Sequence, residues 1–230
     1  ENRANHGGGV YYGTLTNCLV AGNRASGFGG GFYDVTADRC QVVSNFAGSG
    51  GGAIYGSFYH CWFFGNIASG DGGGSYQSTF YNCTVVSNRA FQYGGIRGGT
   101  LYNSILYYNA ACVDPEYGSS CTFSYSCVTP LPTGVGNFTN PPGIAALNNP
   151  RLLADSPCIN TASNQAWTTN ALDLDGEPRI QGGRVDVGAD EYWSVSVTGG
   201  LSVAILAAYT QAVVGFALPL QAWIEGRPTG

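Results

Sequence analysis

The sequence predicts an all-β solenoid, a fold in which short strands wind in successive coils around a common core. Cysteine recurs at a nearly constant interval: Cys18, Cys40, Cys61 and Cys83 follow one another at spacings of 22, 21 and 22, and Ser104 holds the next position. The composition, with 36 Gly and 15 Tyr, favours short strands joined by tight turns. A repeat of this length has room for two or three short strands and no helix, which is typical of one solenoid coil.

Further columns of like residues appear when the repeats are aligned on the cysteine position. Their members are Gly9, Gly31, Gly52, Gly74 and Gly95, then Asn23, Asn45, Asn66, Asn88 and Asn109, and then Ala25, Ala47, Ala68, Ala90 and Ala111. Because stacked coils are about 4.8 Å apart, each column is expected to become a ladder of like side chains. Glycine suits turns with positive φ, and the asparagine amide can bond to the asparagines above and below. Asn2 fits the asparagine column, so the chain is expected to start inside an earlier coil.

Short apolar runs between these markers are expected to form the strands. Leu19-Val20-Ala21, Trp62-Phe63-Phe64 and Thr84-Val85-Val86 fall at equivalent positions of their repeats. Each run is too short for a helix and ends at Gly or Asn, which is typical of short strands.

The eight cysteines divide into two groups. The column of Cys18, Cys40, Cys61 and Cys83 is interpreted as buried thiols, with disulfides between stacked cysteines as the alternative, because stacked Cα atoms lie within disulfide range. Zinc is not expected there, since ligands along one line do not surround a tetrahedral ion. The other four lie in loop-rich sequence, where we expect disulfides, with Cys112–Cys121 and Cys127–Cys158 favoured among three possible pairings.

The charge balance excludes several classes of partner. All nine basic residues are arginine, against fourteen acidic residues, and only 10% of the chain is charged. Such a chain lacks the basic surface that nucleic acids or anionic membranes require. The N-terminal region shows no signal peptide, so we expect that one was removed or that the chain begins inside a longer protein.

Candidate chemical groups are sparse, and no catalytic, cofactor-binding or metal-binding residue is assigned. The acids of the regular coils are Asp34, Asp38 and Asp71, and no neighbouring coil complements them as a catalytic pair requires. His60 is expected to be a surface side chain, as is His6. The segment Asp173-Leu174-Asp175-Gly176-Glu177 resembles the start of a Ca²⁺ loop but lacks the later acidic ligand.

Tyrosines provide the other notable surface pattern. Tyr59, Tyr81 and Tyr102 occupy one column and are expected to form an aromatic ladder, while Tyr11, Tyr33 and Tyr76 lie elsewhere on the coils. Such aromatic rings could stack on sugars, although packing between neighbouring strands explains the column equally well.

Two sets of motifs resemble known families. Gly52-Ala53-Ile54 and Phe63-Phe64-Gly65-Asn66 resemble the GGA(I/L/V) and FxxN repeats of chlamydial polymorphic outer membrane proteins, although most coils carry glycine triplets instead. That resemblance implies a right-handed parallel β-helix of the pectate-lyase-like class. Five ordered motifs, including Ser156-Pro157-Cys158-Ile159-Asn160 and Asp173-Leu174-Asp175-Gly176-Glu177-Pro178-Arg179, resemble the C-terminal part of bacterial choice-of-anchor Q surface proteins, where this region ends the β-helix.

Three segments follow from these patterns. Residues 1–111 are expected to form the regular coils, and residues 112–192 a terminal coil with an irregular cap that covers exposed strand edges. Within the cap, Arg179 and Arg184 are expected to form an ion-pair network with nearby acids, namely Asp173, Asp175, Asp186 and Glu191.

Residues 193–230 form the third segment, whose uncharged stretch from Trp193 to Ile224 is long enough for a transmembrane helix. Alternating apolar residues, such as Leu201, Val203 and Ile205, favour strands instead. The pattern resembles the first two strands of an Ig-like or PKD domain, which need further strands as partners.

The sequence therefore predicts an extracellular structural or adhesive surface protein, not an enzyme, that is a fragment or subunit of a larger surface or filamentous assembly. The alternative is a polysaccharide-binding or lyase-like polysaccharide-degrading β-helix. Expected partners are copies of itself, further domains of the same chain and extracellular glycans.

Overall fold

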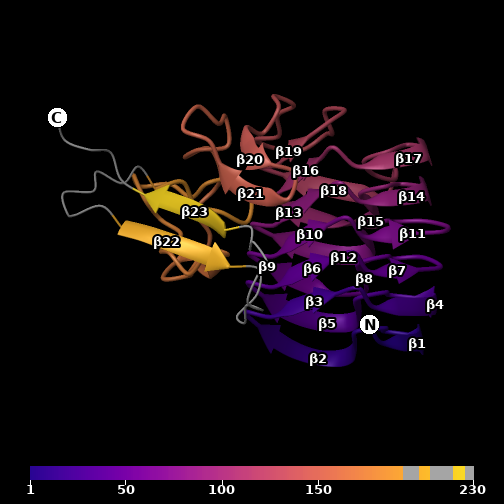
Figure 1. The fold of residues 1–230 in the computed structure, drawn as a ribbon. Helices are drawn as coiled ribbons and strands as arrows, with labels where there is room; N and C mark the ends of the chain where they lie inside the picture. Colours follow the sequence, from indigo (N-terminus) through magenta and orange to yellow (C-terminus); the bar gives the residue numbers. More distant parts are fainter. Residues whose placement is uncertain (194–201, 208–219, 226–230) are drawn as a thin grey trace, which may run out of the picture. The chain divides into compact units, whose positions relative to one another are not determined.

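The computed structural model describes residues 1–193, 202–207 and 220–225, and almost all regular structure in them is β-strand (Figure 1). Glu1–Tyr192 form one compact unit and Trp193–Gly230 a second. The one helical element in the described residues is a single 3₁₀ turn, η1 (Ala166–Thr168). The predicted all-β class is therefore confirmed.

Three parallel sheets form the walls of the solenoid, and each coil contributes to all three (Figure 1). The first sheet contains β1 (Arg3–His6), β4 (Arg24–Phe28), β7 (Phe46–Ala47), β11 (Ile67–Ala68), β14 (Arg89–Gln92) and β17 (Ala110–Val113). The second contains β2 (Val10–Thr16), β5 (Phe32–Asp38), β8 (Ala53–Ile54) with β9 (Ser57–Tyr59), β12 (Ser75–Tyr81), β15 (Ile96–Tyr102) and β18 (Cys121–Ser124). The third contains β3 (Leu19–Ala21), β6 (Gln41–Val43), β10 (Trp62–Phe64), β13 (Thr84–Val86), β16 (Ile105–Tyr107) and β19 (Cys127–Val128).

The strand register confirms the period that the cysteine column predicts. In the third sheet Val20 pairs with Val42, Val42 with Phe63, and Phe63 with Val85. Like residues therefore lie one above another, and the inward side chains form a continuous apolar core. Phe32, Phe58, Phe63 and Phe80 are fully buried in it, and each such side chain contributes roughly 1.5–3 kcal/mol through burial.

The asparagine column forms a buried hydrogen-bonded ladder. The backbone N–H and Nδ2 of Asn45 both donate to Oδ1 of Asn66, each at 3.0 Å, and Asn66 donates in the same way to Asn88. The ladder ends at Asn109, whose backbone N–H and Nδ2 donate to the two carboxyl oxygens of Glu116 at 3.1 and 2.8 Å. A carboxylate suits this end because it offers two acceptors and no donor.

The cysteine column forms a second ladder, in which each coil again donates to the next coil along the chain. The backbone N–H of Cys40 donates to Sγ of Cys61, and that of Cys61 to Sγ of Cys83, both at 3.3 Å. Beyond Cys83 the acceptors become oxygens, in the order Ser104, Ser126 and Asn137. The thiol is thus a small core group that also accepts one main-chain donor. The buried-thiol interpretation is confirmed for Cys40, Cys61 and Cys83, whereas Cys18 in the first coil is only partly buried.

The two predicted disulfides are wrong, because all eight cysteines of the described region are free. Cys112 lies exposed on the first sheet, whereas Cys121 belongs to the second sheet and packs against the core. Cys127 and Cys158 do lie in one buried cluster, where they are neighbouring thiols.

A tight turn precedes the cysteine position in every coil. The residue there has a left-handed backbone with φ between 49° and 52°, and its occupants in successive coils are Asn17, Arg39, His60, Asn82, Asn103 and Tyr125. Asparagine tolerates this conformation best, and the other residues hold it because strands on both sides fix the backbone.

Glycine triplets form another close turn, where the chain passes from the first sheet to the second. Gly50 has φ of +64°, and a Cβ on Gly52 would lie 2.5 Å from the carbonyl oxygen of Gly74 in the next coil. Only glycine allows coils to approach this closely.

The region after the regular coils first extends the end of the solenoid. The edge of β19 is continued by residues 135–138, because Val128 donates its N–H to the carbonyl of Phe138, which in turn donates to Ser126. Residues 115–117 likewise pair with Gly95 and Ile96. Regular pairing therefore continues past residue 111.

Residues 140–192, here called the lateral segment, then pack along the side of the third sheet (Figure 1). The segment contains an antiparallel pair, β20 (Ile144–Ala146) and β21 (Asn149–Leu152). Asn82 donates to the carbonyl of Asp186 at 3.1 Å, and Ala189 donates its N–H to the Thr84 hydroxyl at 3.0 Å. Trp62 and Ile105 of the third sheet share an apolar cluster with Val185 and Val187. The segment thus covers one wall of the solenoid, in addition to the pairing at its end.

The described strands of the second unit are β22 (Ser202–Ala207) and β23 (Leu220–Glu225), which pair antiparallel. The strand interpretation of this segment is confirmed for these residues. Among the described residues no helix is long and apolar enough to cross a membrane. The resemblance to an Ig-like domain involves residues outside the described ones and stays a prediction.

Interruption of the asparagine ladder should destabilise the fold. Asn66→Ala removes the acceptor of two Asn45 donors and leaves them buried, so we expect the free energy of unfolding to fall by about 3 kcal/mol. Urea denaturation followed by circular dichroism measures this loss. The matched control is Asn5→Ala, where the same side chain is exposed and the change should stay below about 0.5 kcal/mol. Equal losses in the two variants would contradict the ladder's role.

Thiol reactivity should follow position in the fold. Burial raises the pKa of the Cys61 thiol, and the Cys61 hydrogen bond followed by burial raises the pKa of Cys40. Thiolates are the reactive species, so iodoacetamide should modify exposed Cys112 long before Cys40 or Cys61 in the native protein. Peptide mass spectrometry over a time course measures the order, and denatured protein, in which all eight should react, is the control.

Candidate functional site

Asp38 is held by two basic side chains of the solenoid. His60 Nδ1 lies 2.8 Å from Asp38 Oδ1, and Arg39 Nε lies 3.2 Å from Asp38 Oδ2. Burial acts to raise the pKa of Asp38, but the hydrogen bonds and charges of His60 and Arg39 outweigh it and lower that pKa. Asp38 is therefore an ionised anchor for its neighbours.

His60 is not the surface side chain that the sequence predicted. It is 4% exposed, and burial lowers its pKa more than Asp38 raises it, so the ring is neutral at pH 7. The prediction failed because the lateral segment covers this turn, as it also covers Asn82 and Asn103. An Asp–His pair can activate a nucleophile, but His60 Nε2 is enclosed and has no access to a substrate.

The other acids of the regular coils are also not arranged as a catalytic pair. Asp71 forms an ion pair with Arg97, whose guanidinium lies over the Tyr76 ring at 5.1 Å. Asp34 is exposed at a turn with φ of 53°. Glycoside hydrolysis requires two carboxyl groups at a fixed separation, whereas the ion-pair partners of Asp38 and Asp71 are basic side chains.

Buried charges of the lateral segment organise its loops. Arg179 is fully buried and donates from Nη2 to the carbonyl of Asp186 at 2.8 Å, with Glu191 Oε2 at 3.8 Å. Asp173 accepts the backbone N–H groups of Asp175, Glu177 and Glu191 at 2.8–3.0 Å. These bonds make Asp173 the centre of a backbone turn.

The predicted ion-pair network is thus only partly correct. Arg179 lies beside the acid Glu191 as predicted. Arg184 instead donates to the carbonyl oxygens of Thr161 and Ala162. Asp175 pairs with Arg151 at 2.7 Å, a partner the sequence did not indicate. In the described residues no cluster of three or more His, Cys, Asp or Glu side chains is arranged to hold a metal ion.

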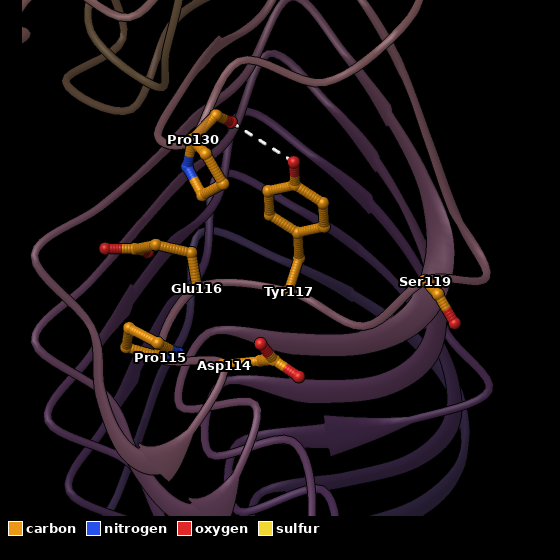
Figure 2. Close-up of a pocket in the computed structure, with 6 residues that line it drawn as sticks. All are labelled: Asp114, Pro115, Glu116, Tyr117, Ser119 and Pro130. Carbon is orange, nitrogen blue, oxygen red and sulfur yellow. Dashed lines mark hydrogen bonds between the residues drawn. The ribbon is translucent and has the colours of Figure 1, made fainter.

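A shallow pocket of about 240 Å³ lies at the C-terminal end of the coils (Figure 2). Tyr117 spans it and donates its hydroxyl to the carbonyl of Pro130 at 3.1 Å, while the Glu116 carboxyl points away from the Tyr117 ring. Because the Glu116 carboxyl is engaged by Asn109, the free acid of this pocket is Asp114 alone. The pocket is best explained as part of the structure that ends the asparagine ladder.

The predicted tyrosine ladder is confirmed, and the lateral segment adds a tryptophan to it. The rings of Tyr59 and Tyr81 stack at 4.6 Å with 9° between their planes, and those of Tyr81 and Tyr102 at 5.4 Å with 7°. Trp167 meets Tyr81 edge-on at 4.9 Å and Tyr102 at 5.8 Å. Its indole Nε1 donates to Asn82 Oδ1 at 3.2 Å, which fixes the ring.

A second pocket, of about 220 Å³, opens where this ladder ends. It is lined by Tyr102, Asn103, Ser124, Tyr125, Val135, Gln165 and Trp167. Sequence reasoning found Tyr102 from its column but missed Trp167 and Gln165, because they lie in aperiodic sequence far along the chain from the coil that they contact. This aromatic corner is the candidate binding site of the described chain.

No protein-family model, no curated protein and no solved structure matches this chain. The resemblances to polymorphic outer membrane proteins and to choice-of-anchor Q proteins therefore stay predictions, and the fold stands on the strand pairing itself.

Buried acids predict a characteristic pH dependence of stability. Burial raises the pKa of Asp190 to about 7, of Glu191 to about 8 and of Glu116 to about 7. A carboxyl group with a raised folded-state pKa binds its proton more tightly when folded, so its stabilisation is complete below the unfolded pKa and lost as pH rises through the folded pKa. The free energy of unfolding should therefore fall between about pH 5 and about pH 8.

Asp190→Asn tests whether buried acids cause this pH dependence, because asparagine can still accept the hydrogen bond from the Leu152 N–H but carries no charge. The free energy of unfolding of the variant should exceed that of the natural chain by about 2 kcal/mol at about pH 8. At about pH 4 the difference should be small, because the unfolded chain also begins to bind the proton there. Denaturant titrations at both pH values measure the difference. Asp155→Asn, at an exposed position, is the matched control, and an equal gain there would contradict the assignment.

Proposed function

We propose that this chain is a structural and adhesive scaffold of an extracellular surface protein, and that its solenoid is one part of a larger surface or filamentous assembly. The observation that carries the proposal is the pair of uninterrupted ladders along the solenoid. Because each coil satisfies the buried donors of its neighbour, coils can be added along the axis without a new core. This property suits a rod-shaped scaffold that holds binding surfaces away from the cell.

Further observations support a scaffold in preference to an enzyme. The acids at Asp38 and Asp71 are engaged by basic side chains, and His60 Nε2 is enclosed. Location outside the cell is supported by the ordered choice-of-anchor Q motifs in residues 136–191. Partner strands for β22 and β23 would come from further domains or another copy.

The alternative is a polysaccharide-binding or polysaccharide-degrading β-helix. A degrading enzyme predicts turnover, whereas the pocket beside Tyr102 and Trp167 supports sugar binding.

Surface exposure can be tested on intact cells of the source organism. Antibodies raised against the purified chain should label cells without permeabilisation, while a cytoplasmic marker protein should need it. The purified chain should release neither reducing ends nor unsaturated products from a panel of neutral and uronate polysaccharides. Labelling that requires permeabilisation would overturn the location, and turnover that is lost in Asp34→Ala or Asp38→Asn would overturn the scaffold in favour of an enzyme.

A further inference from the structure

We infer that the pocket between Tyr102 and Trp167 binds one neutral pyranose ring of a glycan. The inference rests on the adhesive part of the proposed function and names the ligand that the adhesive surface would take. It is carried by three features of the pocket: an uncovered aromatic face, a second aromatic wall and a lining without charged side chains.

The uncovered face belongs to Tyr102, the last ring of the tyrosine ladder. One face of Tyr102 stacks on Tyr81, but its register partner in the next coil is Ser124, whose side chain is too small to cover the other face. The stack therefore ends over open space, which is the pocket. The negative π-face of a phenol ring attracts the weakly positive C–H groups that line one side of a pyranose.

Trp167 forms the second wall and is held in place before any ligand arrives. Its ring is inclined at 56° to Tyr102, so the two aromatic surfaces enclose a wedge. The Nε1 bond to Asn82 and the packing against Tyr81 fix its orientation. Such a site loses little conformational entropy on binding, which matters for a ligand that offers few contacts.

The remaining lining selects a small polar molecule without charge. Ser124, Tyr125 and Gln165 present hydroxyl and amide groups, and the seven lining residues include no carboxylate, arginine or histidine. A uronate carboxylate would lose its hydration without gaining a cationic partner, so a neutral sugar is favoured. The volume of about 220 Å³ is below that of typical drug-sized sites and suits a single ring.

Isothermal titration calorimetry of the full chain tests the inference with neutral oligosaccharides (gluco-, manno-, galacto- and xylo-series) and with oligogalacturonate of equal length. We expect saturable binding of at least one neutral series, with oligogalacturonate at least about tenfold weaker. Tyr102→Ala and Trp167→Ala should each weaken that binding at least about tenfold. Tyr59→Ala is the matched control, because it removes a ring of the same ladder far from the pocket and should leave affinity unchanged.

Ser124→Trp provides a second test that removes no part of the ladder. The larger side chain would occupy the space below Tyr102, so binding should be lost while the thermal unfolding midpoint stays near that of the natural chain. The inference is overturned if no neutral series saturates, if binding persists in Ser124→Trp, if oligogalacturonate binds best, or if phenol binds as tightly as the sugars. These outcomes would not contradict the proposed surface scaffold, since the labelling of intact cells does not depend on this pocket.

Discussion

The spacing of about 4.8 Å between stacked coils is the constraint on which the structure depends. At that distance an inward side chain meets its equivalent in the coils above and below, so a buried polar group must find its partner in its own column. Asparagine meets this requirement because its amide both donates and accepts, and cysteine meets it as a small acceptor of one N–H group. The same spacing excludes a Cβ at Gly52, which explains why that column contains only glycine.

A ladder must also stop, and its end requires a different residue. Glu116 supplies two acceptors to Asn109, and Asn137 accepts the last donor of the cysteine and serine column. Both come from sequence that has left the repeat, which shows that the aperiodic loops complete the core. The burial of Glu116 raises its pKa, because the two bonds from Asn109 do not fully replace its hydration.

The lateral segment changes what the solenoid surface can do. It covers His60, whose Nε2 is enclosed, while the Asp38 carboxylate that holds the ring stays partly exposed. At the same corner it places Trp167 beside the exposed end of the tyrosine ladder. The same packing therefore leaves His60 Nε2 enclosed and forms the pocket that we propose as a sugar site.

The sequence by itself determined the coil length, the strand positions, the Asn and Cys ladders and the Tyr59–Tyr102 stack. It could do so because a repeat of nearly constant length turns a spacing along the chain into a contact in space. The tertiary structure alone decided that His60 is buried, that Arg151 pairs with Asp175, that the eight thiols are free and that Trp167 completes a pocket. These contacts join a periodic to an aperiodic part of the chain, as between Asn82 and Asp186, whose hydrogen bond spans more than four coil lengths of sequence. No repeat links such positions, and only the packing of the lateral segment on the third sheet brings them together.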